Sequence, residues 1–285
     1  MLWVDKKWPV PGHRVKIQPM QADQQSFINC RACDASIQRA DFLAAHSVCP
    51  VCGHHHMLTG YERLDLLTGG ADCELIGESL VASDVLNFAD QMTYQERLEK
   101  ARKKSDMTES VISAVSAVDG VAAVLSIFDF GFIGGSLGEV AGSRIALAIQ
   151  TAMSRKLPFI CVTASGGARM QEGVLSLFQM AKMSAAVQQL RQTRLPFFNV
   201  LTHPTFGGVT ASIAMQADVI IAEKGAHIGF TGARVIANSA QQKLPDGFQT
   251  AEFLVQHGAI DDVVGRDQLV SYLGRNLRKA LANQS

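Results

Sequence analysis

The sequence predicts an α/β fold, built as a spiral of ββα units, with a small cysteine-rich module in front of it. Apolar β-rich runs recur along the chain, and each is followed by apolar residues at helical spacing; the strand candidates are 159–163, 197–201 and 219–222, and the helix candidates are 170–190, 209–215 and 234–241. Asp119-Gly120 separates two further β-rich runs as a hairpin turn. Each repeat ends its strand in glycine or threonine and then starts a helix, which favours an open spiral over a closed barrel.

Several shorter elements are also predicted. Thr93 and Glu96 form a capping-box pattern at the start of a charged helix. The remaining candidates are a helix at 61–67 ended by Gly69-Gly70, a strand at 226–230, a helix capped by Thr250, and an amphipathic final helix at 269–281. The apolar face of the last helix packs either in the core or against another subunit.

Composition excludes several classes of protein. The 285 residues are 47% hydrophobic and 18% charged, which excludes a disordered chain. The net charge is zero, so no overall electrostatic attraction draws the protein to nucleic acid. No apolar run approaches membrane-spanning length, and the N-terminus lacks a hydrophobic signal core, so we expect a cytoplasmic protein without membrane association. We divide the chain into an N-terminal arm at 1–26, a cysteine module at 27–57 and a large domain at 58–285.

The cysteine module carries two CxxC pairs. Cys30 and Cys33 are followed after fifteen residues by Cys49 and Cys52, a spacing typical of a four-thiolate zinc ribbon. Four cysteines leave no open coordination position, so the sequence predicts one structural Zn²⁺ per chain. A redox CxxC is the alternative, but two copies in a short stretch disfavour it. The histidines at 54–56 are expected to be exposed.

Paired glycines follow two of the predicted strands. Gly166-Gly167 and Gly207-Gly208 each stand where a strand turns into a helix, where backbone N–H groups are expected to point outward without a partner. A glycine pair lets a ligand oxygen approach those N–H groups without meeting a Cβ, which is the geometry of an oxyanion hole. Two such holes without a clear nucleophile indicate enolate chemistry. Ser165 has no histidine and aspartate at the spacing of a triad.

A third glycine-rich loop contains Gly134, Gly135 and Gly138 and leads into a helix ending near Ser154. It is either a tight packing corner or a loop for a phosphate or acyl group at a helix N-terminus. It is not a dinucleotide fingerprint, because no acidic residue follows about twenty positions on.

Taken together, the motifs resemble a known family. The zinc ribbon is followed in order by Phe132-Ile133-Gly134-Gly135-Ser136-Leu137-Gly138, Ala164-Ser165-Gly166-Gly167-Ala168-Arg169-Met170-Gln171-Glu172, Pro204-Thr205-Phe206-Gly207-Gly208-Val209 and Gly258-Ala259-Ile260-Asp261. This ordered set resembles the β subunit of the bacterial multisubunit acetyl-CoA carboxylase carboxyltransferase from about residue 27 to 281. The resemblance implies a crotonase (ClpP-like) ββα spiral preceded by a small four-cysteine zinc ribbon, working with an α subunit as α2β2.

The resemblance also implies a reaction and its other components. Carboxybiotin on a biotin carboxyl carrier protein, loaded by biotin carboxylase, would meet acetyl-CoA between the β and α subunits and give malonyl-CoA. Gly207 and Gly208 match the family's oxyanion pair, and Gly166 and Gly167 match its glycines near the thioester. Gly134, Gly135 and Gly138 match its acyl-CoA loop.

Arg169 and three departures from the family pattern bear on the pocket. Arg169 is a candidate for the CoA phosphates or for an ion pair, and a structural role is favoured. His203, Phe206 and Ala233 stand where the family usually has aspartate, methionine and proline, and Phe206 is a candidate for substrate contact. These departures indicate a divergent or duplicated copy whose pocket has altered contacts.

Three other functions compete with this interpretation. A zinc ribbon followed by histidines and a basic helix also fits nucleic-acid binding, although the ribbon itself is not strongly basic. A hydratase or isomerase of the same fold would need carboxylates at the pocket, where Glu139 and Glu172 are the near candidates. A related biotin-dependent acyl-CoA carboxylase or decarboxylase would use the same two holes.

Overall fold

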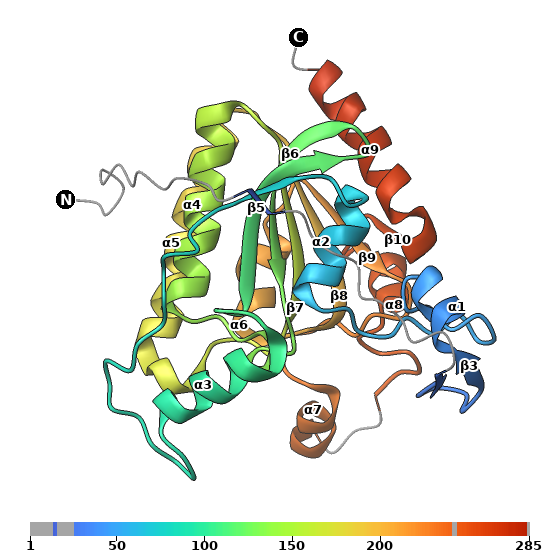
Figure 1. Cartoon of the computed structure of the whole chain (residues 1–285), viewed down its shortest axis with the longest axis horizontal. Helices are drawn as coiled ribbons and strands as arrows, with labels where there is room; N and C mark the ends of the chain where they lie inside the picture. Colours follow the sequence, from blue (N-terminus) through green and yellow to red (C-terminus); the bar gives the residue numbers. More distant parts are fainter. Residues whose placement is uncertain (1–13, 16–25, 241–243, 284–285) are drawn as a thin grey trace.

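The computed structural model describes residues 14–15, 26–240 and 244–283, and an eight-stranded sheet forms its centre (Figure 1). The sheet order is β1-β4-β5-β6-β7-β8-β9-β10. The strands are β1 (Arg14–Val15), β4 (Cys73–Leu75), β5 (Val111–Val118), β6 (Val121–Phe128), β7 (Phe159–Ser165), β8 (Phe197–Thr205), β9 (Val219–Glu223) and β10 (Asp262–Val264). β6 to β10 run parallel, whereas β1, β4, β5 and β6 pair antiparallel.

The antiparallel half contains the predicted hairpin. β5 and β6 pair without a break from Val111 opposite Phe128 to Val118 opposite Val121. Asp119 and Gly120, between them, have φ of 49° and 76°, the left-handed values that a two-residue hairpin loop of this kind needs.

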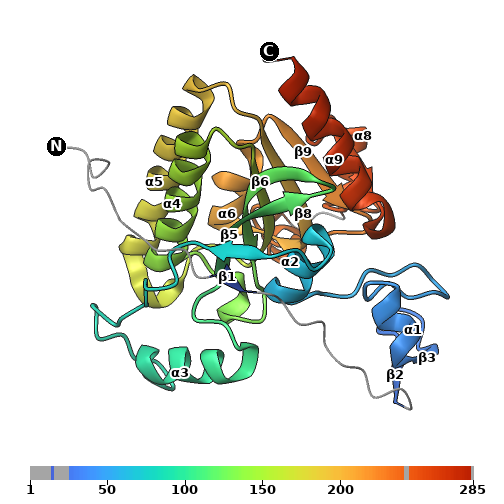
Figure 2. The same ribbon diagram turned by 45° about the horizontal axis from the view of Figure 1, so that its top comes forward.

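Helices cover both faces of the sheet, as Figures 1 and 2 show. α4 (Glu139–Arg155) and α5 (Gly173–Gln192) lie side by side on one face, and α2 (Gly60–Thr68) and α9 (Arg266–Ala282) lie on the other. α3 (Tyr94–Ser105) packs into the second layer through Tyr94 and Leu98. The smaller helices are α6 (Gly207–Thr210), α7 (Ala233–Ala240) and α8 (Ala251–Gln256), with 3-10 turns at Ile133–Gly135, Met170–Glu172 and Ile213–Met215.

Alternate residues of each central strand enter opposite cores, because successive side chains of a strand point to opposite faces. In β7, Phe159 and Cys161 join the core under α4 and α5, whereas Ile160 and Val162 join the core under α2, α3 and α9. Both faces are therefore buried, which explains why these strands read as continuous apolar runs rather than alternating ones. This layered mixed sheet confirms the predicted α/β class.

Side-chain hydrogen bonds form the helix caps at Thr93 and Thr250 that the sequence predicts. Thr93 and Glu96 form both hydrogen bonds of a capping box, and Thr59 and Glu62 form a second one at α2. Thr250 caps α8 by accepting the Phe253 N–H. The predicted helix at 234–241 corresponds to α7, and Gln241 lies outside the described residues.

Two predicted elements are absent from the structure in the form expected. The predicted strand at 226–230 is wrong, because this stretch makes only isolated bridges, His227 with Thr250 and Ile228 with Thr205. The predicted helix at 209–215 is instead α6 and a separate 3-10 turn, because Ser212 between them has φ −134° and ψ −111°. The short strands β4 and β10 were not predicted at all.

The cysteine module stands beside the sheet (Figure 2). It consists of the antiparallel pair β2 (Phe27–Asn29) and β3 (Ser36–Gln38), followed by α1 (Arg39–Ala44). Ile37, Phe42 and two of the cysteines form its own small core. Among the described residues, no helix combines the length and apolarity needed to span a membrane.

Candidate active site and metal centre

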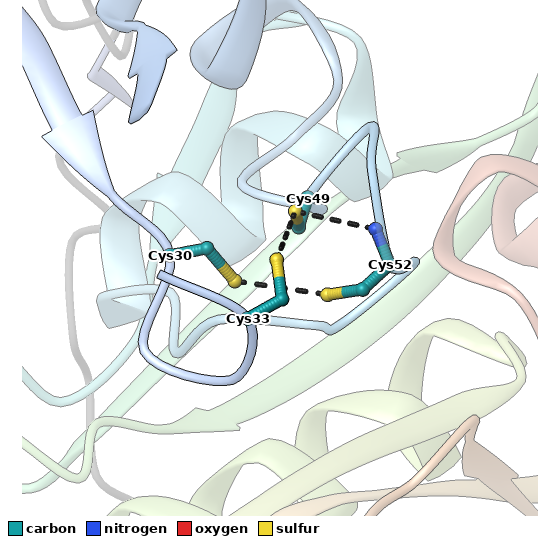
Figure 3. Close-up of side chains that lie close together, drawn as sticks. All are labelled: Cys30, Cys33, Cys49 and Cys52. Atoms are coloured by element: carbon teal, nitrogen blue, oxygen red, sulfur yellow. Dashed lines mark hydrogen bonds between the residues drawn. The ribbon is translucent and has the colours of Figure 1, made fainter. Parts of the chain in front are cut away.

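The four cysteines of the module converge on one point (Figure 3). Their sulfur atoms all lie within 4.8 Å of one another. The Ala32 N–H points at the Cys30 sulfur at 3.4 Å and the Cys52 N–H at the Cys49 sulfur at 3.5 Å. Such N–H groups stabilise thiolates, the form of cysteine that binds metals. The cluster is suited to hold one metal ion.

A buried ionic cluster joins this module to the sheet. Arg266 donates to the His46 carbonyl in the module at 2.7 Å and to the Glu223 carboxylate at the end of β9 at 2.7 and 2.9 Å. Arg63 of α2 also binds Glu223. Burial would raise the pKa of Glu223, but the charges and hydrogen bonds of the two arginines outweigh it and hold this pKa well below its usual value. The carboxylate is therefore ionised.

The two paired-glycine turns touch each other. A methyl group built on Gly207 would lie 3.0 Å from both the Gly166 carbonyl oxygen and the Gly167 Cα. A methyl on Gly167 would lie 3.2 Å from the Gly208 nitrogen. Contacts of 3.0–3.2 Å with backbone atoms are tighter than most real Cβ contacts, so these glycines allow the two backbones to approach closely. The ends of β7 and β8 thus form one continuous site.

The expectation that all four glycine N–H groups are unpaired is wrong. Gly166 donates to the Gly134 carbonyl at 2.9 Å, and Gly207 donates to the Phe230 carbonyl at 3.0 Å. The Gly167 N–H donates to the Ser165 hydroxyl oxygen at 3.0 Å. Only the Gly208 N–H, of these four, has no hydrogen-bond partner among the described residues.

A second unpartnered donor lies next to Gly208. The Ala168 N–H also has no partner within the described part of the chain, and it lies 3.5 Å from a methyl built on Gly208. Both residues are partly exposed. Sequence reasoning missed Ala168, although its position directly after a glycine pair is where a turn presents N–H groups. Two adjacent free donors at a helix start can bind an oxyanion.

The glycine-rich loop after β6 is held in a left-handed conformation. Ile133, Gly134 and Gly135 have successive φ values of 47°, 64° and 62°. A β-branched residue at positive φ is an outlier that stores about 1–3 kcal/mol, and such strain clusters at functional sites. A methyl on Gly135 would lie 1.9 Å from the Ala164 carbonyl oxygen, so packing alone requires glycine there.

The space around the other two glycines of the loop, Gly134 and Gly138, is not alike. A methyl on Gly138 would lie 2.6 Å from the Glu172 carboxylate and 2.8 Å from the Arg169 guanidinium, so this glycine is also required by packing. Gly134 faces open space. It lines a hollow of about 500 Å³ with Met57, Lys104 and other residues, so of the three loop glycines it is the one open to a ligand.

Arg169 is not available for a substrate phosphate, which corrects one expectation for it. Its side chain is 0% exposed and pairs with the equally buried Glu109. It also donates to the Ser136 carbonyl at 2.8 Å and the Tyr94 hydroxyl at 3.1 Å. The guanidinium therefore ties the glycine loop, α3 and the start of β5 to the turn after β7.

Four further residues were candidates in the sequence: Ser165, Phe206, His203 and Ala233. Ser165 is fully buried and engaged with Gly167, so it is not a nucleophile. Phe206 is half-buried, and its ring lies near Gly229. His203 is exposed at the end of β8. The side chain of Ala233 lies outside the described residues.

An apolar stripe runs along the first turns of α5 and the turn before it. Met170, Val174, Leu177 and Phe178 are each 53–63% exposed and lie on one helical face. A contiguous exposed apolar patch on a folded domain often marks an interaction surface.

Comparisons with known proteins identify the family of the chain. The family model of the carboxyl transferase domain matches residues 78–277, which include the glycine loop and both paired-glycine turns. The chain is 43% identical over 272 residues to the acetyl-coenzyme A carboxylase carboxyl transferase subunit beta of Pelobacter propionicus, covering 94% of this chain and 96% of that one. It is 46% identical over 266 residues to the subunit of the same name from Synechococcus sp. WH7803, covering 93% and 90%. The chain belongs to the family of acetyl-CoA carboxylase carboxyl transferase β subunits, which confirms the resemblance.

A solved structure shares the fold. The transcarboxylase 12S structure with bound methylmalonyl-coenzyme A matches with a TM-score of 0.64 and 26% identity. The match covers 77% of this chain and 41% of the transcarboxylase chain, so this chain spans less than half of that protein. The crotonase-like carboxyl transferase fold is thereby confirmed.

Proposed function

We propose that this chain, with a carboxyltransferase α subunit, moves a carboxyl group from carboxybiotin to acetyl-CoA and so makes malonyl-CoA for fatty acid synthesis. The observation that carries the proposal is the pair of unpartnered N–H groups of Gly208 and Ala168, in a chain of this family. Gly207 joins them only if the Phe230 carbonyl moves away.

The contribution of the chain to the reaction is electrostatic. The thioester of acetyl-CoA becomes an enolate, whose oxygen gains negative charge, and preorganised N–H donors stabilise that charge; one lost donor costs about 2.7–4 kcal/mol of barrier. Carboxybiotin supplies the carbon dioxide and the ureido nitrogen that accepts the proton.

The hydrogen bonds of Glu172 are consistent with a reaction in which biotin, and not a side chain, accepts the proton. Glu172, a base candidate for a hydratase, is buried and accepts hydrogen bonds from the Tyr94 hydroxyl at 2.6 Å and the Glu139 N–H at 2.5 Å. It is therefore held in a structural role. A hydratase would need a carboxylate free to take a proton, and Glu172 does not meet that need.

The 500 Å³ hollow at Gly134 supports the acyl-CoA part of the proposal. Ile133 and Met57 give it apolar walls. Such walls suit the pantetheine arm of acetyl-CoA. The apolar stripe at Met170, Val174, Leu177 and Phe178 is the surface we assign to the α subunit, since the patch is exposed and borders the turn that carries Ala168.

The metal of the cysteine module is proposed to be Zn²⁺. A tetrahedral ion with Zn–S bonds of about 2.3 Å places its sulfurs about 3.8 Å apart. Cys30 and Cys52 have a sulfur–sulfur distance of 3.7 Å, and Cys33 and Cys49 one of 3.8 Å. Four thiolates close the coordination sphere, so the metal holds structure rather than reacting. The cytoplasm, where such thiols stay reduced, is the proposed compartment.

The test is direct. The purified chain and its α partner, with carboxylated biotin carrier protein loaded by biotin carboxylase, are expected to convert acetyl-CoA into malonyl-CoA. Turnover of a longer acyl-CoA but not acetyl-CoA would reject the substrate. Hydration of an enoyl-CoA without biotin or partner would reject the class of reaction.

A further inference from the structure

A second, smaller hollow lies between the cysteine module and the sheet. It has a volume of about 180 Å³ and is enclosed by the linker 54–58, the end of β8, and the loop after β9. It shares Met57, Leu58 and Phe130 with the 500 Å³ hollow that reaches Gly134. The two hollows are therefore neighbours that share part of their walls.

The lining of the small hollow is cationic. Arg63, Arg266 and Lys224 contribute three positive charges, and Glu223 is the one carboxylate among the lining residues. Glu223 accepts hydrogen bonds from both arginines, but its single negative charge balances only one of the three positive charges. The lining therefore keeps a net positive charge even when every histidine is neutral. Lys224 is exposed and makes no hydrogen bond or ion pair through its side chain within the described residues. An excess of fixed positive charge favours an anion.

Histidines add oriented donors to these charges. The Nδ1 of His203 accepts the His227 N–H at 3.3 Å, so the ring hydrogen of neutral His203 must be on Nε2. His227 packs edge-on against His203 at 5.3 Å and has no ring hydrogen bond in the described structure. Both rings are accessible and line the hollow.

His55 adds a further buried polar atom to the lining of this hollow. Its side chain is only 8% exposed, and its Nδ1 has no hydrogen-bond partner in the described structure. The nearest carboxylate oxygen, on Glu223, is 3.7 Å away, which is too long for a hydrogen bond. The low exposure of His55 also corrects the expectation that the histidines at 54–56 are exposed, because only His54 is.

We propose that this small hollow binds a phosphate group of the acyl-CoA substrate, with Lys224, His203 and His227 as its donors. The inference rests on the proposed function. The larger hollow takes the uncharged pantetheine arm, and the smaller one takes phosphate oxygens, whose charge matches its lining. Its 180 Å³ fits one phosphate with its water but not a nucleoside as well.

The test compares two substrates in the assembled carboxyltransferase. Lys224→Ala is expected to raise the KM for acetyl-CoA roughly tenfold, since one charged hydrogen bond is lost, with kcat unchanged. The KM for acetyl-pantetheine, which has no nucleotide phosphates, stays as in the unmodified enzyme. Lys279→Ala, an exposed lysine on α9, is the matched control and changes neither value. An unchanged acetyl-CoA KM in Lys224→Ala overturns the proposal.

Two further measurements separate other sources of phosphate. Inorganic pyrophosphate should compete with acetyl-CoA but not with acetyl-pantetheine, and His203→Gln should weaken this competition. If a single-stranded oligonucleotide binds through Lys224 while the acetyl-CoA KM stays constant, the site serves nucleic acid and our proposal is wrong. Calorimetric titration of the full chain with CoA tests the site even if no malonyl-CoA forms, so the two proposals fail separately.

Discussion

Replacing Gly208 by alanine tests the central physical claim, that free backbone N–H groups stabilise the enolate. The new methyl group would lie 3.5 Å from the Ala168 nitrogen. A bound oxyanion needs to stand about 2.7–3.1 Å from that nitrogen, so methyl and oxyanion compete for the same space. Blocking one donor is expected to lower kcat by roughly 10²–10³, or about 2.7–4 kcal/mol.

The same substitution should leave the fold intact. The methyl would lie 3.1 Å from the Met180 sulfur, which is the flexible end of a side chain. Overpacking of this size costs about 1 kcal/mol in the free energy of unfolding, measurable by urea denaturation.

A matched control and steady-state kinetics complete the experiment. Gly232→Ala meets no heavy atom within 4 Å and should retain full activity. Malonyl-CoA formation by the assembled enzyme would be followed at saturating acetyl-CoA. If Gly208→Ala keeps more than half of kcat, the N–H groups at this point do not carry the reaction, and our reasoning is refuted.

Four further outcomes are expected. Elemental analysis should find one zinc per chain, and Cys33→Ser should reduce it and lower the melting temperature of the module. Arg169→Met leaves buried Glu109 unpaired and should cost about 3–5 kcal/mol in urea denaturation, whereas the double variant with Glu109→Leu should recover part of it. Burial raises the pKa of Glu109, but the Arg169 charge outweighs burial, so the folded-state pKa is lowered. The ionised carboxylate therefore stabilises the fold fully above pH 4.5, the usual pKa, and this stabilisation is lost as the pH falls through the lower folded-state pKa. Glu109→Gln should weaken this loss of stability at acid pH. Gly135→Ala places a methyl 1.9 Å from a backbone oxygen and should prevent soluble expression.

Local chemistry accounts for the parts of the fold that were predicted. The capping box at Thr93, the hairpin at Asp119-Gly120 and the four-cysteine spacing depend on residues close in sequence, and each is present. The segment 226–230 was predicted as a strand, but its neighbours in space form only single bridges with it. Strand pairing is decided by distant segments, so composition alone misjudges it.

The site was predicted in position but not in detail. The sequence indicated the strand-end glycines, yet it gave no sign that the two turns touch or that the Phe230 carbonyl occupies the Gly207 N–H. The burial of Arg169 was equally hidden, because its partner Glu109 is 60 residues away. Such contacts arise only when the sheet brings strand ends together.

The bond from Arg266 to the His46 carbonyl spans 220 positions of the chain. During synthesis the N-terminal cysteines leave the ribosome long before Arg266 exists. The contact between Arg266 and the module can therefore form only after the C-terminal helix has been made, later than any contact within the module itself.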